Sequence, residues 1–446
     1  MEPNSQLNAL IGESGMSRAG LASRVNRRGD QVGVTLRYDH TAVARWVKGQ
    51  RPRGRVPELI CEVLGERLSR TLTLDDIGMG ASAPAVPPPT EGELRRFVER
   101  APVLWRWDEP HPDQSGPPLL DGAAAVAPVW EWENPPEDVD VAHRGTCRVS
   151  PGDVTVLRAA RAHYEQLYRN AGGVATRPRV VGFLTHSVAP LLAGEYDDAT
   201  GRALHRASGS LAALTGVCAY DGDAQGLAQR YFHQALRLAK ASGDRPFGGY
   251  VVALLVNQAL FLGDHRRALA CAEAALRAAD GRVSPALATD LYVMQATAYA
   301  HLGDRRHAHD RMRVAEWHAG RLSDRDEPEE MGYVQPGLLE VRLAEALLVL
   351  GELGPAARYA ERAAREPSHV RGTVNRLATL TDVEVRRDEP ERAAATADRM
   401  VERARGMESQ RLRGRMRAVR DRLAQHPASC AHAAAERIDD ALRVPL

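Results

Sequence analysis

The sequence is poor in aromatic residues, in cysteine and in long apolar runs, and each shortage excludes a class of protein. Aromatic residues make up only 5% of the 446 residues, whereas alanine and leucine abound, which favours helices over β-sandwiches. The five cysteines are scattered singly, without a Cys-x-x-Cys pair, so we expect neither a disulfide scaffold nor a zinc knuckle. A reducing cytoplasm is then the natural compartment. Because the chain has neither an apolar run of about 18 residues nor a basic segment followed by an apolar core at its start, we expect no membrane span and no secretory signal.

Catalytic signatures are also missing. The sequence contains no Walker A motif, no Gly-x-Ser-x-Gly and no set of kinase motifs. One cluster, formed by His301, His307, His309 and Asp310, suggests metal ligands, but no His-Glu-x-x-His pattern is present. The spacing of His307 and His309 directs them to different faces of a helix. We therefore expect a protein that is not an enzyme and that holds neither a metal ion nor a cofactor.

The charge is unevenly distributed, although the formal net charge is only +1. Lysine is nearly absent, with only Lys48 and Lys240, so arginine supplies the positive charge. Residues 17–55 contain 10 basic and 2 acidic residues, a balance of +8. A surplus of this size within a short segment is typical of a module that binds a polyanion. The alternative interpretation is a basic face that is simply solvated.

With 446 residues the chain exceeds the size of one ordinary domain. Its composition divides it into four parts. Residues 1–78 predict a compact bundle of short helices, and residues 79–92, rich in Pro, Ala and Gly, predict a linker. Residues 93–150 form a connecting segment rich in tryptophan and proline, in which the alternation APVWEWENP predicts a short strand or an extended arm packed on the helical body. Residues 151–446 show helical periodicity throughout.

The last part repeats a short turn that carries glycine and an acidic residue. The turns are Gly222-Asp223, Gly263-Asp264, Gly303-Asp304, Gly351-Glu352 and a degenerate Asp388-Glu389, at intervals of 41, 40, 48 and 37 residues. An apolar helix precedes each turn and an alanine-rich amphipathic helix follows it, so the pattern predicts stacked helical hairpins, an α-solenoid. The alternative is a helical bundle without a repeat. The pattern resembles tetratricopeptide repeats, although the intervals exceed the usual length of about 34 residues and the aromatic signature is incomplete.

Within the basic segment, two short helices are expected to pack against each other. The first is SRAGLASRV, for which Ser17 is a suitable N-cap. The second lies in YDHTAVARWVKGQRPRG, where Asp39 caps the helix and Gly49 ends it. The i, i+3 spacing of Val43 and Trp46 buries these two side chains together. A closing helix, PELICEVLGERL, completes the predicted bundle.

These residues resemble the recognition helix of the Cro/repressor (XRE-like) helix-turn-helix family. The resemblance rests on a Ser/Thr–aliphatic–small–Arg–Trp run followed by glycine, here Thr41, Val43, Ala44, Arg45, Trp46 and Gly49. One departure is the separation of 25 residues between Leu21 and Trp46, which is longer than in the family. The extra stretch near NRRGDQVGVTLRYD must form a longer helix, a loop or a small wing.

The resemblance implies that the second helix enters the major groove of double-stranded DNA. The residues expected to contact bases are His40, Thr41, Ala44 and Arg45. The residues expected to neutralise phosphates are Arg18, Arg37, Lys48, Arg51, Arg53 and Arg55. For any single arginine the alternative is solvent exposure without a DNA contact.

Over its whole length the chain resembles actinobacterial regulators that join such a head to a tetratricopeptide body, in particular the streptomycete type that represses sporulation and antibiotic production. The stretches RYDHTAVARWVKGQRPRGRVPELI and GLAQRYFHQALRLA carry this likeness. It implies a repressor-like transcriptional regulator of development or secondary metabolism. We expect a homodimer, with the interface in residues 409–445 or 93–150. The rival hypothesis is a scaffold that gathers partner proteins, with a basic head that is not specific for DNA.

The repeat domain is expected to offer a concave groove lined by the first helix of each hairpin. Polar candidates for this lining are Asn257, Gln258, Tyr292, Gln295 and Tyr299. Their side chains suit the backbone of a bound peptide or the polar groups of a small-molecule effector. The alternative is that each of them faces solvent.

Overall fold

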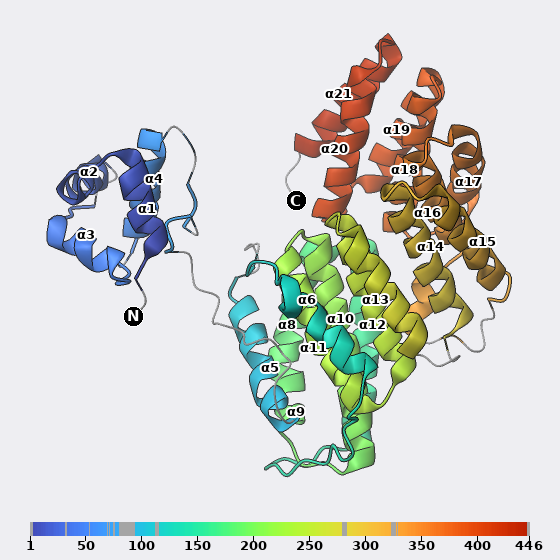
Figure 1. Cartoon of the computed structure of the whole chain (residues 1–446), viewed down its shortest axis with the longest axis horizontal. Coiled ribbons are helices and arrows are strands. Elements are labelled where there is room, and N and C mark those ends of the chain that lie inside the picture. The colour runs from blue at the N-terminus through green and yellow to red at the C-terminus, as the bar shows by residue number, and fades with distance from the viewer. Residues whose placement is uncertain are drawn as a thin grey trace. The chain divides into compact units, whose positions relative to one another are not determined.

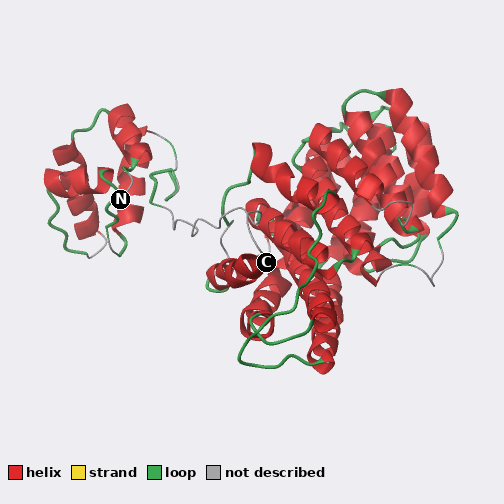
Figure 2. Ribbon diagram, turned by 60° about the horizontal axis from the view of Figure 1, so that its bottom comes forward, coloured by secondary structure: helices red, strands yellow, loops and turns green. Residues whose placement is uncertain are grey.

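The chain folds into two compact units, Met1–Ala85 and Val86–Leu446. The computed structural model describes residues 3–31, 34–52, 54–68, 70, 72–74, 76–79, 94–111, 116–278, 283–322, 327 and 329–443. Within those residues the regular structure is helical and no strand is present, which confirms the predicted all-α class (Figures 1 and 2). Apart from Met79, the predicted linker 79–92 lies outside the described residues. None of the described helices is both long and apolar enough to cross a membrane.

The N-terminal unit is a bundle of four helices. These are α1 (Ser5–Ser14), α2 (Arg18–Gln31), α3 (His40–Val47) and α4 (Val56–Leu68). One apolar cluster holds them together, since every helix contributes leucine, isoleucine, valine, alanine or tryptophan side chains to it. The expected N-cap of α2 is present, because the Ser17 hydroxyl accepts a hydrogen bond from the amide of Gly20 at 3.1 Å.

The extra stretch between the two predicted helices forms a longer helix followed by a loop. Helix α2 continues to Gln31, and residues 34–39 have no regular structure. The side chain of Asn26 fastens this loop, because its amide donates to the carbonyl of Tyr38 and its oxygen accepts from the Tyr38 amide, both at 2.9 Å. At Gly29 a β-carbon would lie 2.7 Å from the carbonyl oxygen of Val34, so only glycine lets the loop pack this closely.

The tryptophan-rich segment contains two helices, α5 (Leu94–Asp108) and α6 (Gly122–Glu133), that pack on the helical body. The predicted strand or extended arm at APVWEWENP is therefore wrong. Val129 and Trp132, three residues apart, are buried, whereas Trp130 is 64% exposed, which is a helical pattern. A β-carbon at Gly248 would lie 2.0 Å from Nε1 of Trp132, so a glycine in the array makes room for the indole.

The rest of the C-terminal unit begins with α7 (Pro151–Ala171), α8 (Gly173–Phe183), the π-helix η1 (Leu184–Val188) and α9 (Ala189–Leu192). Helical hairpins follow, and each helix packs on its partner and on the next hairpin (Figure 1). The hairpins are α10 (Asp198–Asp221) with α11 (Gln225–Ser242), α12 (Arg245–Phe261) with α13 (His265–Ala278), α14 (Pro285–His301) with α15 (Arg305–Ala319), α16 (Leu338–Val349) with α17 (Leu353–Arg365), α18 (Val370–Arg386) with α19 (Pro390–Ala404), and α20 (Gln410–Gln425) with α21 (Ser429–Arg443). A 3-10 helix, η2 (Glu329–Tyr333), lies between α15 and α16. The array is repeat-like, as the sequence predicted.

The recurring turns share one hydrogen-bonded geometry. At each turn a residue with positive φ follows the helix, and the next amide returns to a carbonyl five residues earlier, as in a Schellman motif. The positive-φ residues are Asp223, Gly263, Gly303, Gly351 and Asp388. The first predicted turn was therefore one residue out of register, because Asp223 and not Gly222 takes the left-handed conformation, with φ of 63°. Aspartate tolerates this region better than most other residues.

The beginning and the end of the helical array in the C-terminal unit are tied together. The amide of Glu408 donates to the carbonyl of Ala171 at 2.8 Å, and the amide of Val174 donates to the carbonyl of Glu408 at 3.2 Å. Gly172 lies at this junction with φ of 95°, where a β-carbon would lie 2.3 Å from the Glu408 carbonyl oxygen. Helices α7 and α10 thus lie against α18 and α20.

Candidate functional site

The first helix turn of α3 is fixed by Asp39. Its Oδ1 accepts hydrogen bonds from the amides of Thr41 at 3.1 Å and Ala42 at 2.9 Å, and from the Thr41 hydroxyl at 2.6 Å. The hydroxyl of Thr41 and these amides lower the pKa of the exposed Asp39 carboxyl. The expected cap is present, and the hydroxyl predicted to contact a base is hydrogen-bonded within the helix turn.

The rotation of α3 about its axis is set by two buried side chains. Val43 is fully buried and Trp46 is 3% exposed, as their spacing predicts. The indole of Trp46 packs edge-on against the ring of Tyr38, with 5.0 Å between the ring centroids. Because these residues face the core, the opposite side of α3 faces solvent.

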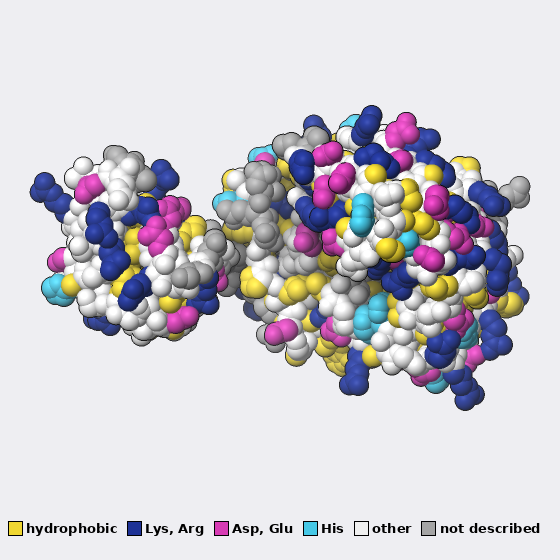
Figure 3. All heavy atoms as spheres, turned by 90° about the horizontal axis from the view of Figure 1, so that it is seen from above, with side chains coloured by type: hydrophobic (Ala, Val, Ile, Leu, Met, Phe, Trp, Pro, Cys, Tyr) yellow, Lys and Arg dark blue, Asp and Glu magenta, His cyan; other side chains and the backbone are white. Residues whose placement is uncertain are grey.

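The residues predicted to contact DNA are mostly exposed. On α3 and at its end, His40, Thr41, Arg45 and Lys48 are exposed and Ala44 is half-buried. Exposed positions elsewhere in the unit are Arg18, Arg37, Arg51 and Arg55, whereas Arg53 lies outside the described residues. Figure 3 shows Lys and Arg side chains on the surface of the N-terminal unit.

Some arginines of the N-terminal unit stabilise its fold. Arg28 forms ion pairs with Glu62 and Glu66 of α4, and the Nε of Arg67 donates to the carbonyl of Ser14 at 3.3 Å. These arginines are therefore engaged in contacts within the N-terminal unit.

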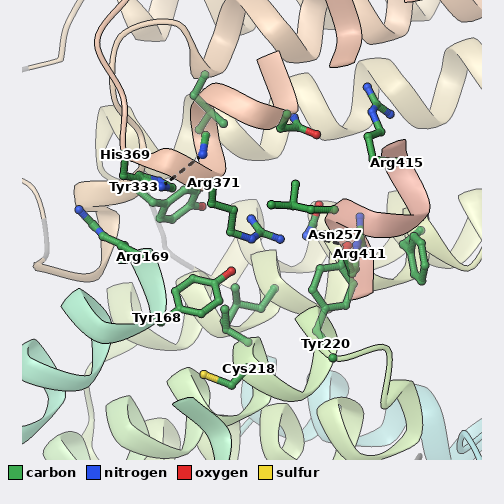
Figure 4. Close-up of a pocket in the computed structure, with 18 of the residues that line it drawn as sticks. Tyr168, Arg169, Cys218, Tyr220, Asn257, Tyr333, His369, Arg371, Arg411 and Arg415 are labelled. Carbon is green, nitrogen blue, oxygen red and sulfur yellow. Dashed lines mark hydrogen bonds between the residues drawn. The ribbon is translucent and has the colours of Figure 1, made fainter. Parts of the chain in front are cut away.

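The C-terminal unit contains a large cavity of about 1180 Å³. Its wall is built from the first helix of each hairpin, together with α7, α8 and η2 (Figure 4). The cavity has an apolar part, to which Leu214, Leu254 and Val341 contribute, and a polar part rich in arginine. Its volume slightly exceeds the usual range for small-molecule sites, which ends at about 1000 Å³.

Cations outnumber carboxylates in this wall. The arginines are Arg161, Arg169, Arg177, Arg342, Arg371, Arg376, Arg411, Arg415 and Arg417, and the carboxylates are Glu165, Asp223, Asp290, Glu330 and Glu345. Many of the arginines have partners within the unit: Arg415 contacts Glu345 at 2.6 Å, and Arg342 contacts Asp290 at 3.2 Å.

One fully buried carboxylate, Asp221, links the helices that close the cavity. It accepts hydrogen bonds from Arg371 of α18 at 2.7 Å, from the Ser409 hydroxyl at 2.8 Å and from the amide of Gly173 at 2.9 Å. The Arg371 guanidinium also lies 5.5 Å from the ring centroid of Tyr168.

Of the five residues predicted to line a groove, only Asn257 borders the cavity, where its amide donates to the Tyr220 hydroxyl at 3.2 Å. The amide of Gln258 donates to the carbonyl of Gln225 at 2.7 Å, and the buried Gln295 is 2% exposed. The two tyrosines stack on histidines: Tyr292 on His318 at 5.3 Å and Tyr299 on His307 at 5.2 Å.

The arginines of the cavity, above all Arg371 and Arg411, were not among the residues predicted from the sequence. The one local signal was the i, i+4 spacing of Arg411 and Arg415 on a helix with unusually many arginines. In the part of the chain that the structure describes, no group of three or more His, Cys, Asp or Glu side chains could hold a metal ion.

Comparison with known families places a match in the N-terminal unit. Residues 7–80 match the family model described as the SP15 N-terminal domain. The match begins within α1 and extends beyond α4, so it spans the bundle that carries α3. No curated protein matches the chain.

Proposed function

We propose that the protein is a sequence-specific DNA-binding transcriptional regulator whose N-terminal unit inserts α3 into the major groove. The observation that carries the proposal is the two-sided character of this helix. Val43 and Trp46 anchor one side in the core, while Arg45 and Lys48 extend from the other side into solvent. A short helix held in this way can present side chains to base edges with little loss of conformational freedom.

The resemblance of this segment to Cro/repressor-type regulators supports the proposal and suggests repression of genes for development or secondary metabolism. The C-terminal unit, with its tetratricopeptide-like hairpins, then serves dimerisation and the sensing of an effector. Two-fold symmetry would let two copies of α3 read a near-palindromic operator. Sedimentation of the full chain as a monomer at the concentrations that bind DNA would contradict the dimer.

The decisive experiment measures binding of the full chain to genomic fragments, followed by substitutions at Arg45. Arg45→Ala should lose about 1–3 kcal/mol of preference for the selected fragment, because arginine can bind guanine through two hydrogen bonds. Arg45→Lys keeps the positive charge but loses the planar guanidinium that donates two parallel hydrogen bonds. The variant should therefore retain its affinity for random DNA and lose its preference for the selected fragment. The matched control is Arg70→Ala, since Arg70 already pairs with Glu13 at 2.9 Å in the same unit.

Salt dependence separates the two kinds of contact. Lys48→Ala should weaken binding to all sequences and reduce the slope of log K against log salt by about 1. A wild-type chain without preference for any genomic fragment over random competitor would refute the proposal and would favour a scaffold for partner proteins.

A further inference from the structure

The cavity of the C-terminal unit contains a cation, Arg411, that no carboxylate of the described residues neutralises. Arg411 forms no ion pair among the described residues, and its Nη1 is buried without a hydrogen-bond partner. Its guanidinium packs against two aromatic rings, 3.8 Å from the centroid of Phe261 and 4.0 Å from that of Tyr220. A buried hydrogen-bond donor without an acceptor lowers the stability of the folded protein, so the presence of one in this wall requires an explanation.

Other arginines lie near Arg411 on the same wall. Burial lowers the pKa of Arg411 to about 10, and the charge of Arg415, one helix turn away, acts in the same direction. Burial and the charges of Arg169, Arg371 and Arg376 lower the pKa of His369 on the same wall to about 4. Figure 4 shows Arg371 and Arg411 reaching from different helices into the same region, above Tyr168 and Tyr220.

We propose that this cavity binds a small organic anion, whose carboxylate or phosphate group contacts Arg411 and Arg371 and whose apolar part packs against the wall at Leu254 and Val341. An anion would pair with the guanidinium of Arg411, which has no carboxylate partner among the described residues, and would offset the surplus of arginine over carboxylate in the wall. The volume of about 1180 Å³ accommodates a molecule of nucleotide size or larger.

The position of the cavity gives such an anion a way to act on the whole unit. Arg371 is bound to Asp221 of α10, and Arg411 lies on α20, next to Ser409, which binds the same carboxylate. A ligand held by both arginines would therefore strengthen the closure between the two ends of the array. The role of this anion as an effector rests on the proposed function, whereas the binding of the anion to the cavity does not.

The test uses the full chain and two fluorescent probes that differ by one charge: anilinonaphthalene sulfonate, an aromatic anion, and phenylnaphthylamine, its uncharged analogue. We expect the anion to bind more tightly than the neutral probe. Arg411→Gln should weaken binding of the anion about tenfold and leave the neutral probe unchanged. Arg411→Lys should retain most of the affinity, and Arg266→Gln, a loss of charge at an exposed position of α13, should change nothing.

Competition identifies the chemical source of the anion. Displacement of the probe by pyrophosphate points to phosphate ligands and displacement by citrate points to carboxylates, and either result supports the proposal. Displacement by neither, beyond the effect of sodium chloride at equal ionic strength, overturns it. Equal binding of both probes, or unchanged binding in Arg411→Gln with wild-type circular dichroism, also overturns it. Because DNA is absent from this assay, failure of DNA binding would leave its result intact.

Discussion

The two units of this protein place their charges in opposite ways. In the N-terminal unit the core is apolar, and the cations of α3 lie on its surface. In the C-terminal unit several charged groups lie inside, including Asp221, which is fully buried, and Arg161, which is 4% exposed. Surface charge contributes little to stability and is free for a partner, whereas buried charge must be matched within the fold.

This difference explains why the exposed residues of the N-terminal unit could be predicted from the sequence and the cavity of the C-terminal unit could not. The exposed face of α3 follows from helical periodicity within eight residues. The cavity is closed by contacts between residues that are far apart in the chain, such as the ion pair of Asp221 and Arg371, 150 positions apart. No local pattern brings such residues together.

The largest expected effect is a selective acid destabilisation of the C-terminal unit. Burial lowers the pKa of His205 to about 4 and that of His233 to about 3. As the pH falls below about 6.5, these histidines take up protons in the unfolded chain but not in the folded protein. The free energy of unfolding therefore has its full value above pH 6.5 and decreases as the pH drops toward 4. We expect a loss of about 3 kcal/mol for each histidine between pH 7 and pH 4.

Urea titrations at both pH values, read by hydrogen exchange of peptides from each unit, check this prediction. The only histidine of the N-terminal unit, His40, is exposed, so that unit should change much less. The double variant His205→Gln/His233→Gln should lose a large part of the pH dependence, and His369, whose pKa burial also lowers to about 4, should retain its own share. Equal acid sensitivity of both units would remove the contrast between them.

The next effect concerns the buried carboxylate. Asp221→Asn should lower the free energy of unfolding of the C-terminal unit by about 3–5 kcal/mol, because it leaves the Arg371 guanidinium without its anion. The control is Asp398→Asn, which breaks the pair with Arg437 at a position where both side chains are about half exposed, and should cost less than about 1 kcal/mol. Urea denaturation measures both, and similar costs would show that burial does not decide the value of these pairs.

The smallest effect is confined to the N-terminal unit. Asp39→Ala should cost about 1 kcal/mol through loss of the N-cap of α3. Asp30→Ala, which removes an exposed carboxylate near the end of α2, should cost nothing. Hydrogen exchange of α3 measures the change, and an unaltered α3 in Asp39→Ala would mean that Trp46 and Val43 hold the helix without the cap.

Particular residues show where prediction from sequence ended. The caps at Ser17 and Asp39 and the burial of Val43 and Trp46 were predicted, because each depends on neighbours within one or two helix turns. The turn at Asp223 was predicted one residue early, because Gly222 precedes the aspartate that takes the left-handed conformation. The helix α6 was missed because the alternating letters APVWEWENP resemble a strand, and only packing against α11 and α13 shows which face is buried.

The sequence by itself determined the helices, their caps and turns, and the exposed cationic face of α3, because these depend on contacts within a few residues. The tertiary structure alone decided the cavity and its unneutralised Arg411. The cavity and the position of Arg411 depend on the curvature of the helical array, which brings Glu408 into hydrogen-bond contact with Ala171. That curvature results from small packing angles that accumulate over many helices.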